Sequence, residues 1–216
     1  MRTARFIFLM TLGAMLCPAQ WVNLIDGPSL RNWQVVGDGV WSVLGDGTLS
    51  GQRDPRIPNE RPHQNQSWLY TKKEFTEFDL HVEYWLPLGV NSGVSIRDTS
   101  RARYSFGDAA LANPNKTPAH VGYEIQIINE RAEKYPTGSV YLFAVAKTGF
   151  QHDFDWNSLD IESRKSGIRV KLNGHLVSES AGDSQRSLKG PIGLQLHDLK
   201  TVILFRNIRI HEIGGQ

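Results

Sequence analysis

Glu124 and Gln126 are the residues whose types and spacing best suit chemistry on a polar ligand. They alternate with Tyr123, Ile125 and Ile127, which is the pattern of a half-buried β-strand. On such a strand the carboxylate and the amide project from the same side, about 7 Å apart. That pair could bind a polyhydroxylated ligand, or move one proton while the ligand is held. The structural alternative is a solvated sheet face.

Three further segments have the same alternation of polar and apolar side chains. Their polar pairs are His81 with Glu83, Ser95 with Arg97, and Gln195 with His197. If these segments neighbour Glu124 in one sheet, its outer face carries a dense cluster of hydrogen-bonding and titratable groups. A sheet face that is only exposed to water would more usually carry Lys, Thr and Ser than His, Gln, Arg and Asn. We therefore expect this face to have a function.

The segments that must position these residues are short strands. Asp-Gly turns at 37–39 and 45–47 and the Asn-Gly pair at 173–174 indicate hairpins. The stretches 52–66 and 98–120 are rich in Pro, Asn and Arg and predict long surface loops, the second of a kind that borders binding sites. No sustained helical period follows residue 20. The sequence therefore predicts an all-β protein of two packed antiparallel sheets.

The tryptophans divide into two groups. Trp33 and Trp41 lie beside turns among apolar residues, which favours core packing. Trp68, Trp85 and Trp156 lie near the polar pairs or their flanking loops. Each of these three offers a flat ring on which a sugar could stack.

The first nineteen residues are typical of an export signal. Arg2 and Arg5 precede an apolar run over 6–16, and Ala19 is a suitable small residue before a cleavage point. The apolar run is too short to span a bilayer as a mature helix. We expect residues 1–19 to be removed, a secreted or periplasmic protein, and no integral membrane segment afterwards.

Cys17 is the single cysteine and lies within this signal. The alternative of a lipoprotein anchor on Cys17 is disfavoured by the large Leu16 before it. The mature chain then has no disulfide, thiol nucleophile or thiolate metal site. Residues 20–216 are long enough for one domain with its own hydrophobic core.

The charge pattern excludes one class of partner. The formal net charge is +2, with acids and bases interspersed along the chain. No basic block with interleaved aromatic residues occurs, so we do not expect nucleic acid to be a partner.

A set of motifs in order along the chain resembles the 3-keto-disaccharide hydrolase domain family. The matching segments are Asn-Leu-Ile-Asp-Gly-Pro-Ser-Leu-Arg-Asn-Trp (23–33), Leu-Tyr-Thr-Lys-Lys (69–73), Phe-Asp-Leu-His-Val-Glu-Tyr (78–84), Asn-Ser-Gly-Val-Ser-Ile-Arg (91–97), Tyr-Glu-Ile-Gln-Ile (123–127), Thr-Gly-Ser-Val-Tyr (137–141), Asp-Trp-Asn (155–157), Gly-Pro-Ile-Gly-Leu-Gln-Leu-His (190–197) and Phe-Arg-Asn-Ile-Arg-Ile (205–210). The resemblance implies a concanavalin A-like jelly roll, export from a bacterial cell, and hydrolysis of 3-keto glycosides. A keto-sugar glycoside is thus the expected ligand.

A ketone at C3 makes the proton at C2 acidic, and loss of that proton lets the group on C1 leave. This chemistry needs one base to take the proton and donors that stabilise the resulting enolate oxygen. The candidate catalytic residues are Glu124, His197 and Arg97, with Glu124 preferred over His197 as the base and Arg97 holding the developing charge. The candidate substrate-binding residues are Gln126, Asn91, Gln195, Glu83, His81, Trp156 and Tyr141.

Two other functions stay open at this point. Retaining β-glucanases of the same architecture carry three acids in a Glu-x-Asp-x(-x)-Glu pattern on the central strand, whereas this chain has Gln126 and Asn129 at the later positions. A non-catalytic carbohydrate-binding module could use the same polar face. No cofactor is certain; a divalent metal is possible, because His81, Glu83, Glu124 and His197 are competent ligands.

Overall fold

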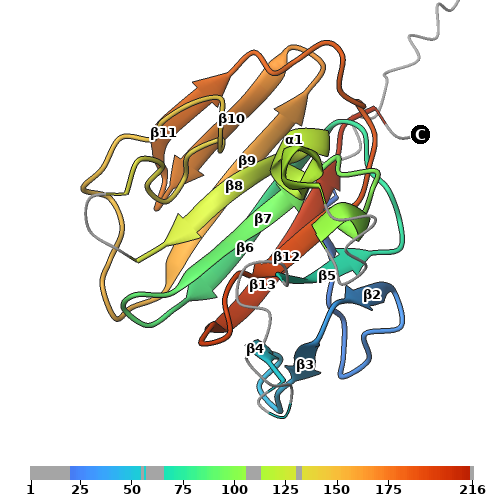
Figure 1. Ribbon diagram of the computed structural model, residues 1–216, viewed down its shortest axis with the longest axis vertical. Helices are drawn as coiled ribbons and strands as arrows, with labels where there is room; N and C mark the ends of the chain where they lie inside the picture. Colours follow the sequence, from blue (N-terminus) through green and yellow to red (C-terminus); the bar gives the residue numbers. More distant parts are fainter. Residues whose placement is uncertain (1–19, 55, 57–65, 106–112, 130–132, 215–216) are drawn as a thin grey trace, which may run out of the picture.

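The computed structural model of the chain describes residues 20–54, 56, 66–105, 113–129 and 133–214 (Figure 1). The expected export signal, with Cys17, lies outside the described residues, as do parts of the two long loops. Within the described residues, no helix is both long and apolar enough to cross a membrane.

The strands of the described residues form two antiparallel sheets. The larger has eight strands in the order β11-β10-β9-β6-β13-β4-β3, with β1 pairing to β13, and the smaller has five in the order β2-β5-β12-β7-β8. The strands are β1 (Val22–Asn23), β2 (Trp33–Val36), β3 (Gly39–Val43), β4 (Leu49–Arg53), β5 (Ser67–Thr71), β6 (Phe78–Trp85), β7 (Asn91–Ile96), β8 (Tyr123–Ile128), β9 (Asn157–Arg164), β10 (Gly167–Leu172), β11 (His175–Ser180), β12 (Ile192–Leu196) and β13 (Val202–Glu212). The predicted two-sheet, all-β architecture is confirmed.

Alternating sequences bury one face of each sheet against the other. In β6 the side chains of Phe78, Leu80, Val82 and Tyr84 are buried, while the residues between them are partly exposed. The apolar set of β8 and β7 meets this face from the other sheet in one hydrophobic cluster. Burial of these side chains is the main source of stability in a chain without disulfides.

The Asp-Gly turns act in two different ways. The turn at 45–47 joins β3 to β4 as a hairpin, and Asn173 and Gly174 have positive φ angles of 50° and 81° in the turn from β10 to β11. The turn at 37–39 instead carries the chain from β2 in the small sheet to β3 in the large one. A hairpin prediction at that turn is therefore wrong.

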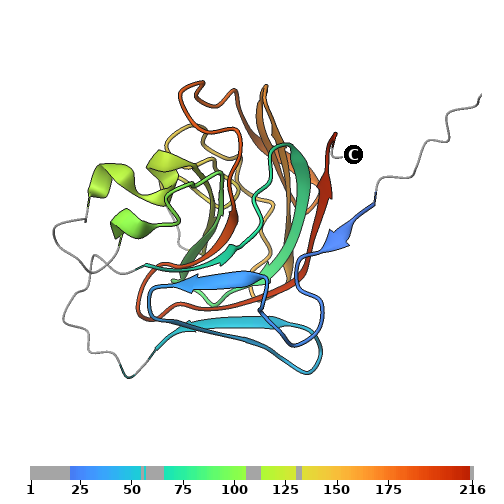
Figure 2. The same cartoon turned by 90° about the vertical axis from the view of Figure 1, so that its right-hand side faces the viewer.

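The five-stranded sheet differs from an ordinary outer sheet because it is buried on both faces. Every residue of β5, β8 and β12 is buried. Figure 2 shows why: the 3-10 turns η1 (Arg103–Ser105) and η2 (Pro114–Lys116) and the short helix α1 (Pro118–Val121) lie on the side of this sheet that faces away from the large sheet. Chemistry on that side would take place in a shielded environment.

Candidate functional site

The outward side chains of the five-stranded sheet form a layer of polar and aromatic groups, here called the polar sheet face: Trp68, Tyr70, Ser95, Glu124, Gln126 and Gln195. Strand register sets their order. Glu124 pairs with Ser95, Ser95 with Gly193, and Gly193 with Tyr70, so these four form one row across the sheet. Gln126 pairs with Gly93, and Gln195 with Trp68, in the next row.

Glu124 lies on β8, the last strand in the order of this sheet, and is 6% exposed. Burial raises the pKa of its carboxyl from an ordinary 4.5 to about 8, and the negative charge of Asp98 acts in the same direction. Gln195 approaches closely enough to oppose the rise, although neither of its amide atoms makes a regular hydrogen bond. Glu124 is thus a proton donor below about pH 8 and a comparatively strong base when ionised.

Several buried polar atoms of the polar sheet face have no hydrogen-bond partner among the described residues. They are the indole Nε1 of Trp68, the Oγ of Ser95, and both amide atoms of Gln195. Buried polar groups are nearly always hydrogen-bonded, and leaving one unpaired costs about 1–3 kcal/mol. Their gathering on the face that also carries the Glu124 carboxyl is the arrangement expected of a site that receives a ligand rich in hydroxyl or carbonyl groups.

Trp68 and Tyr70 form an aromatic wall on the same face. Their rings are stacked, with centroids 5.6 Å apart and an interplanar angle of 20°. The hydroxyl of Tyr70 donates a hydrogen bond to Oδ2 of Asp98 at 2.6 Å. The wall is therefore tied to the segment that follows β7.

Other sequence-predicted residues lie at the rim of this face. Gln126 Nε2 donates to Asn91 Oδ1 at 3.3 Å, and Tyr141 donates its backbone N–H to the carbonyl of Glu124 at 2.8 Å. His197 follows β12, two residues beyond Gln195, and is half-buried. Burial lowers the pKa of its imidazole, which keeps it neutral at pH 7.

Arg97 is not where the sequence predicted. Strand β7 ends at Ile96, and Arg97 has a left-handed φ of 61°, which breaks the alternation that would have directed it toward Glu124. Its Nη2 instead donates to the carbonyl of Arg164 in the other sheet at 3.0 Å. The placement of Arg97 on the face of Glu124 is therefore corrected.

His81, Glu83 and Trp156 are also separated from Glu124, because β6 belongs to the large sheet. His81 contacts Asp160 at 2.6 Å, and Glu83 accepts from Arg206 Nε at 2.6 Å. The guanidinium of Arg206 in turn lies 4.0 Å from the ring centroid of Trp156. The condition that all four polar pairs share one sheet is not met, since β6 lies in the other sheet and an alternating pattern does not reveal which sheet a strand joins.

Sequence reasoning missed Tyr70 and Asp98 as members of the site, and it named Ser95 only as part of the polar face. The alternation Trp68-Leu-Tyr70 in β5 was a usable signal, because it places both aromatic rings on one face. Asp98 gave no such signal. It lies in an irregular segment, and only the fold brings it to Tyr70.

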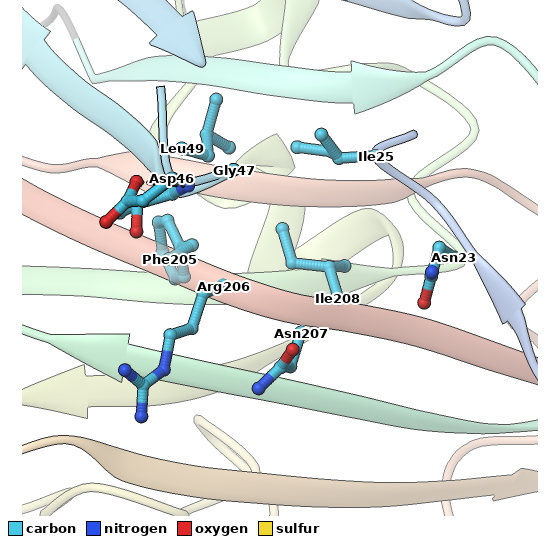
Figure 3. Close-up of a pocket in the computed structure, with 10 residues that line it drawn as sticks. Asn23, Ile25, Asp46, Gly47, Leu49, Phe205, Arg206, Asn207 and Ile208 are labelled. Atoms are coloured by element: carbon cyan, nitrogen blue, oxygen red, sulfur yellow. Dashed lines mark hydrogen bonds between the residues drawn. The ribbon is translucent and has the colours of Figure 1, made fainter. Parts of the chain in front are cut away.

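A separate pocket of about 250 Å³ lies beside β13 on the large sheet (Figure 3). Leu49, Phe205 and Ile208 contribute apolar side chains, while Arg206 and Asn207 are both committed to Glu83. No catalytic set of groups meets there. Among the described residues, no cluster of three or more His, Cys, Asp or Glu side chains suits a metal ion.

Solved structures with a similar fold indicate the class of protein. A crystal structure of a protein described as a glycosyl hydrolase from Parabacteroides distasonis ATCC 8503 matches with a TM-score of 0.64 and 24% identity, over 90% of this chain and 100% of that one. A second such structure from the same organism matches with a TM-score of 0.66 and 19% identity, over 90% and 94%. The Bacillus licheniformis β-glucanase matches with a TM-score of 0.54 and 9% identity, over 90% and 97%. The fold is thus a concanavalin A-like jelly roll.

Sequence comparison then gives the family. The chain belongs to the 3-keto-alpha-glucoside-1,2-lyase-like domains, whose family profile matches residues 20–211. No curated protein sequence matches the chain. Family and fold together make this a carbohydrate-active protein.

Proposed function

We propose that this protein cleaves 3-keto glycosides at the polar sheet face, with Glu124 as the base. The observation that carries the proposal is the set of unpaired buried polar atoms on Trp68, Ser95 and Gln195, on the same sheet face as a buried carboxyl whose pKa is raised to about 8. Family membership supports the choice of a 3-keto glycoside.

The reaction follows from the acidity that a C3 ketone gives to the proton at C2. Transfer of that proton to the base leaves the C2–H electron pair in an enolate whose negative charge lies on the C3 oxygen. Re-formation of the ketone drives electrons into a C1–C2 double bond, and the C1–O bond breaks with its electron pair on the leaving alcohol, which takes up a proton. Water then adds its hydroxyl to C1 and a proton to C2, so the net change is hydrolysis.

The geometry divides the work among named groups. A carboxylate with a raised pKa is a stronger base than an exposed one, and its pKa lies close to working pH. The Trp68 indole N–H, the Ser95 hydroxyl and the Gln195 amide can donate to the enolate oxygen, the role first expected of Arg97. His197, neutral and at the end of β12, is suited to shuttle the leaving-group proton.

The same residues disfavour an ordinary retaining glycosidase. That mechanism needs two carboxyl groups, one of them free to act as nucleophile. Gln126 stands two residues from Glu124 on β8, and the carboxylate of Asp98 is fully engaged by hydrogen-bond donors. One free carboxyl is enough for proton abstraction.

Glu124→Gln tests the proposal most directly, because the change is nearly isosteric. The purified variant should bind a 3-keto glycoside but lose exchange of the substrate's C2 proton with deuterated water, followed by proton NMR. His81→Asn, on the large sheet, is the matched control and should retain exchange. Sugar binding by the wild type with neither exchange nor cleavage of any 3-keto glycoside would replace the proposal with a carbohydrate-binding module.

A further inference from the structure

Asp98 is the most completely bonded carboxylate close to the polar sheet face. It is fully buried. Its Oδ2 accepts from the Tyr70 hydroxyl at 2.6 Å and the Ala102 N–H at 2.8 Å. Its Oδ1 accepts from the N–H and the hydroxyl of Ser100, at 3.0 and 2.5 Å. Four donors converge on one carboxyl group, and hydrogen bonds to a carboxylate are among the strong ones.

Tyr70 connects this buried charge to the site. Burial raises the pKa of its phenol well above the ordinary value, so the hydroxyl remains a donor to Asp98 at any working pH. Its ring stacks on Trp68 and occupies the space above Gly193, where an added β-carbon would come within 2.5 Å of the ring. The hydrogen bond to Asp98 therefore fixes the position of the whole aromatic wall.

The charged and titratable groups around Glu124 are few. Asp98 acts on it from the segment after β7. The charge of Glu124 also adds to the raised pKa of Tyr70 on β5, whose main cause is burial. Burial raises the pKa of the Tyr141 phenol, in the segment after β8, and the charge of Glu124 acts in the same direction. His197 lies at the far end of β12, where Arg53, Asp198 and Glu133 act on it. Within the described residues, Asp98 is thus the fixed negative charge that acts on Glu124.

We propose that Asp98 is a positioning residue for proton transfer at Glu124: through Tyr70 it fixes the aromatic wall, and it keeps a buried negative charge beside the Glu124 carboxyl. The placement deepens the proposed function and rests on it for the role of Glu124 as the base and for the identity of the substrate. In this way Asp98 increases the basicity of the Glu124 carboxyl without itself being a catalytic acid. Asp98 itself is screened from the ligand by its own four donors.

The test measures the titration of Glu124 directly, without substrate. Protein labelled with ¹³C at glutamate side-chain carboxyls is titrated by NMR, and Glu124→Gln identifies the resonance. In Asp98→Asn the midpoint should fall by about one pH unit, because a like charge is removed. The matched control is Asp46→Asn, which loses an equal charge in the β3–β4 turn and should leave the midpoint unchanged. An unmoved midpoint in folded Asp98→Asn overturns the inference.

Tyr70→Phe provides a second variant that keeps the charge of Asp98. Loss of the phenolic donor leaves that charge less compensated, so the Glu124 midpoint should rise. If Asp98→Asn does not fold, this variant decides, and an unmoved or lower midpoint overturns the inference. The pH profile of C2-proton exchange should move with the NMR midpoint. A shifted midpoint in an enzyme that turns over no 3-keto glycoside would instead contradict the proposed function and leave the role of Asp98 intact.

Discussion

Oε1 of Glu124 lies over Gly93, so close that a β-carbon on that glycine would come within 2.8 Å of it. The Oε1 atom of Gln195 lies 3.3 Å from the same point. Neither Gly93 nor Gly193 has a positive φ, so the backbone at both positions would accept alanine. The two glycines are needed for the space they leave, one for a carboxyl and the other for the ring of Tyr70.

Gly93→Ala should therefore displace Glu124 without unfolding the strand. Mispositioning of a catalytic group by about 1 Å costs on the order of 10²-fold in rate, and we expect a loss of kcat/KM of this size. Steady-state kinetics with a 3-keto glycoside, alongside thermal unfolding, measure both consequences.

Gly45→Ala is the control for Gly93→Ala. It lies in the β3–β4 turn with nothing within 4 Å of the added carbon, so activity should be unchanged. Full activity of a well-folded Gly93→Ala would show that Glu124 does not need its present position.

The pH dependence of the reaction should follow Glu124. A base must be ionised, and burial raises its pKa to about 8, so kcat/KM should rise with pH and level off above about 8. Initial rates between pH 5 and 10, at substrate concentrations well below KM, report this value for the free enzyme. A profile that falls through pH 8 would reverse the roles, with Glu124 acting as the acid and His197 as the base.

Stability should also depend on Glu124, with a defined sign. Its pKa rises from 4.5 in the unfolded chain to about 8 in the folded one, so its contribution is fully present below about pH 4.5 and is lost as pH rises through 8. Glu124→Gln removes this dependence, and relative to the wild type it should gain on the order of 4 kcal/mol between pH 4 and pH 9. Urea unfolding at the two pH values measures the difference. A constant difference between the two proteins would contradict the burial of an ionisable group here.

Trp68→Phe isolates one donor to the enolate. The indole N–H is buried and unpaired, and the phenyl ring keeps most of the stacking on Tyr70. Loss of one preorganised donor costs about 10²–10³-fold in kcat, so kcat should fall while KM changes little. A change confined to KM would mean that Trp68 contacts substrate equally in the ground and transition states.

Glu83→Gln examines the residues that the sequence grouped wrongly with Glu124. Glu83 accepts from Arg206 and Asn207 on the outer face of the large sheet. Loss of a partly exposed ion pair should cost up to about 1 kcal/mol of unfolding free energy. Activity should match the wild type, and a large loss of activity would bring the large sheet into the site.

The sequence was sufficient for the architecture and for half of the site. Alternation in β8 placed Glu124 and Gln126 on the outer face, because side-chain direction along a strand follows directly from residue parity. The same rule failed at Arg97, where a single left-handed residue ends the alternation. A left-handed arginine has no local sequence signal, because tertiary contacts impose it.

The sequence also did not reveal which of the two sheets each strand joins. The patterns of β6 and β8 are equally regular, yet the two strands lie in opposite sheets. The odd or even position of a residue shows on which side of its own strand the side chain lies. It does not show which other strand lies next to that strand in a sheet. The burial of Glu124 was hidden for a related reason, since the segments that cover the polar sheet face have no periodic pattern.

The position of β12 and β13 within the sheets has a consequence for how the chain folds. Strand β12 lies between β5 and β7, and β13 pairs with β1, β4 and β6, so the final strands in sequence are central in space. The five-stranded sheet cannot be completed until the chain has been synthesised through Leu196, and the eight-stranded sheet not until Glu212. Contacts this distant in sequence make folding slow. The newly made chain therefore has to remain unfolded and aggregation-prone for longer than one assembled from successive hairpins.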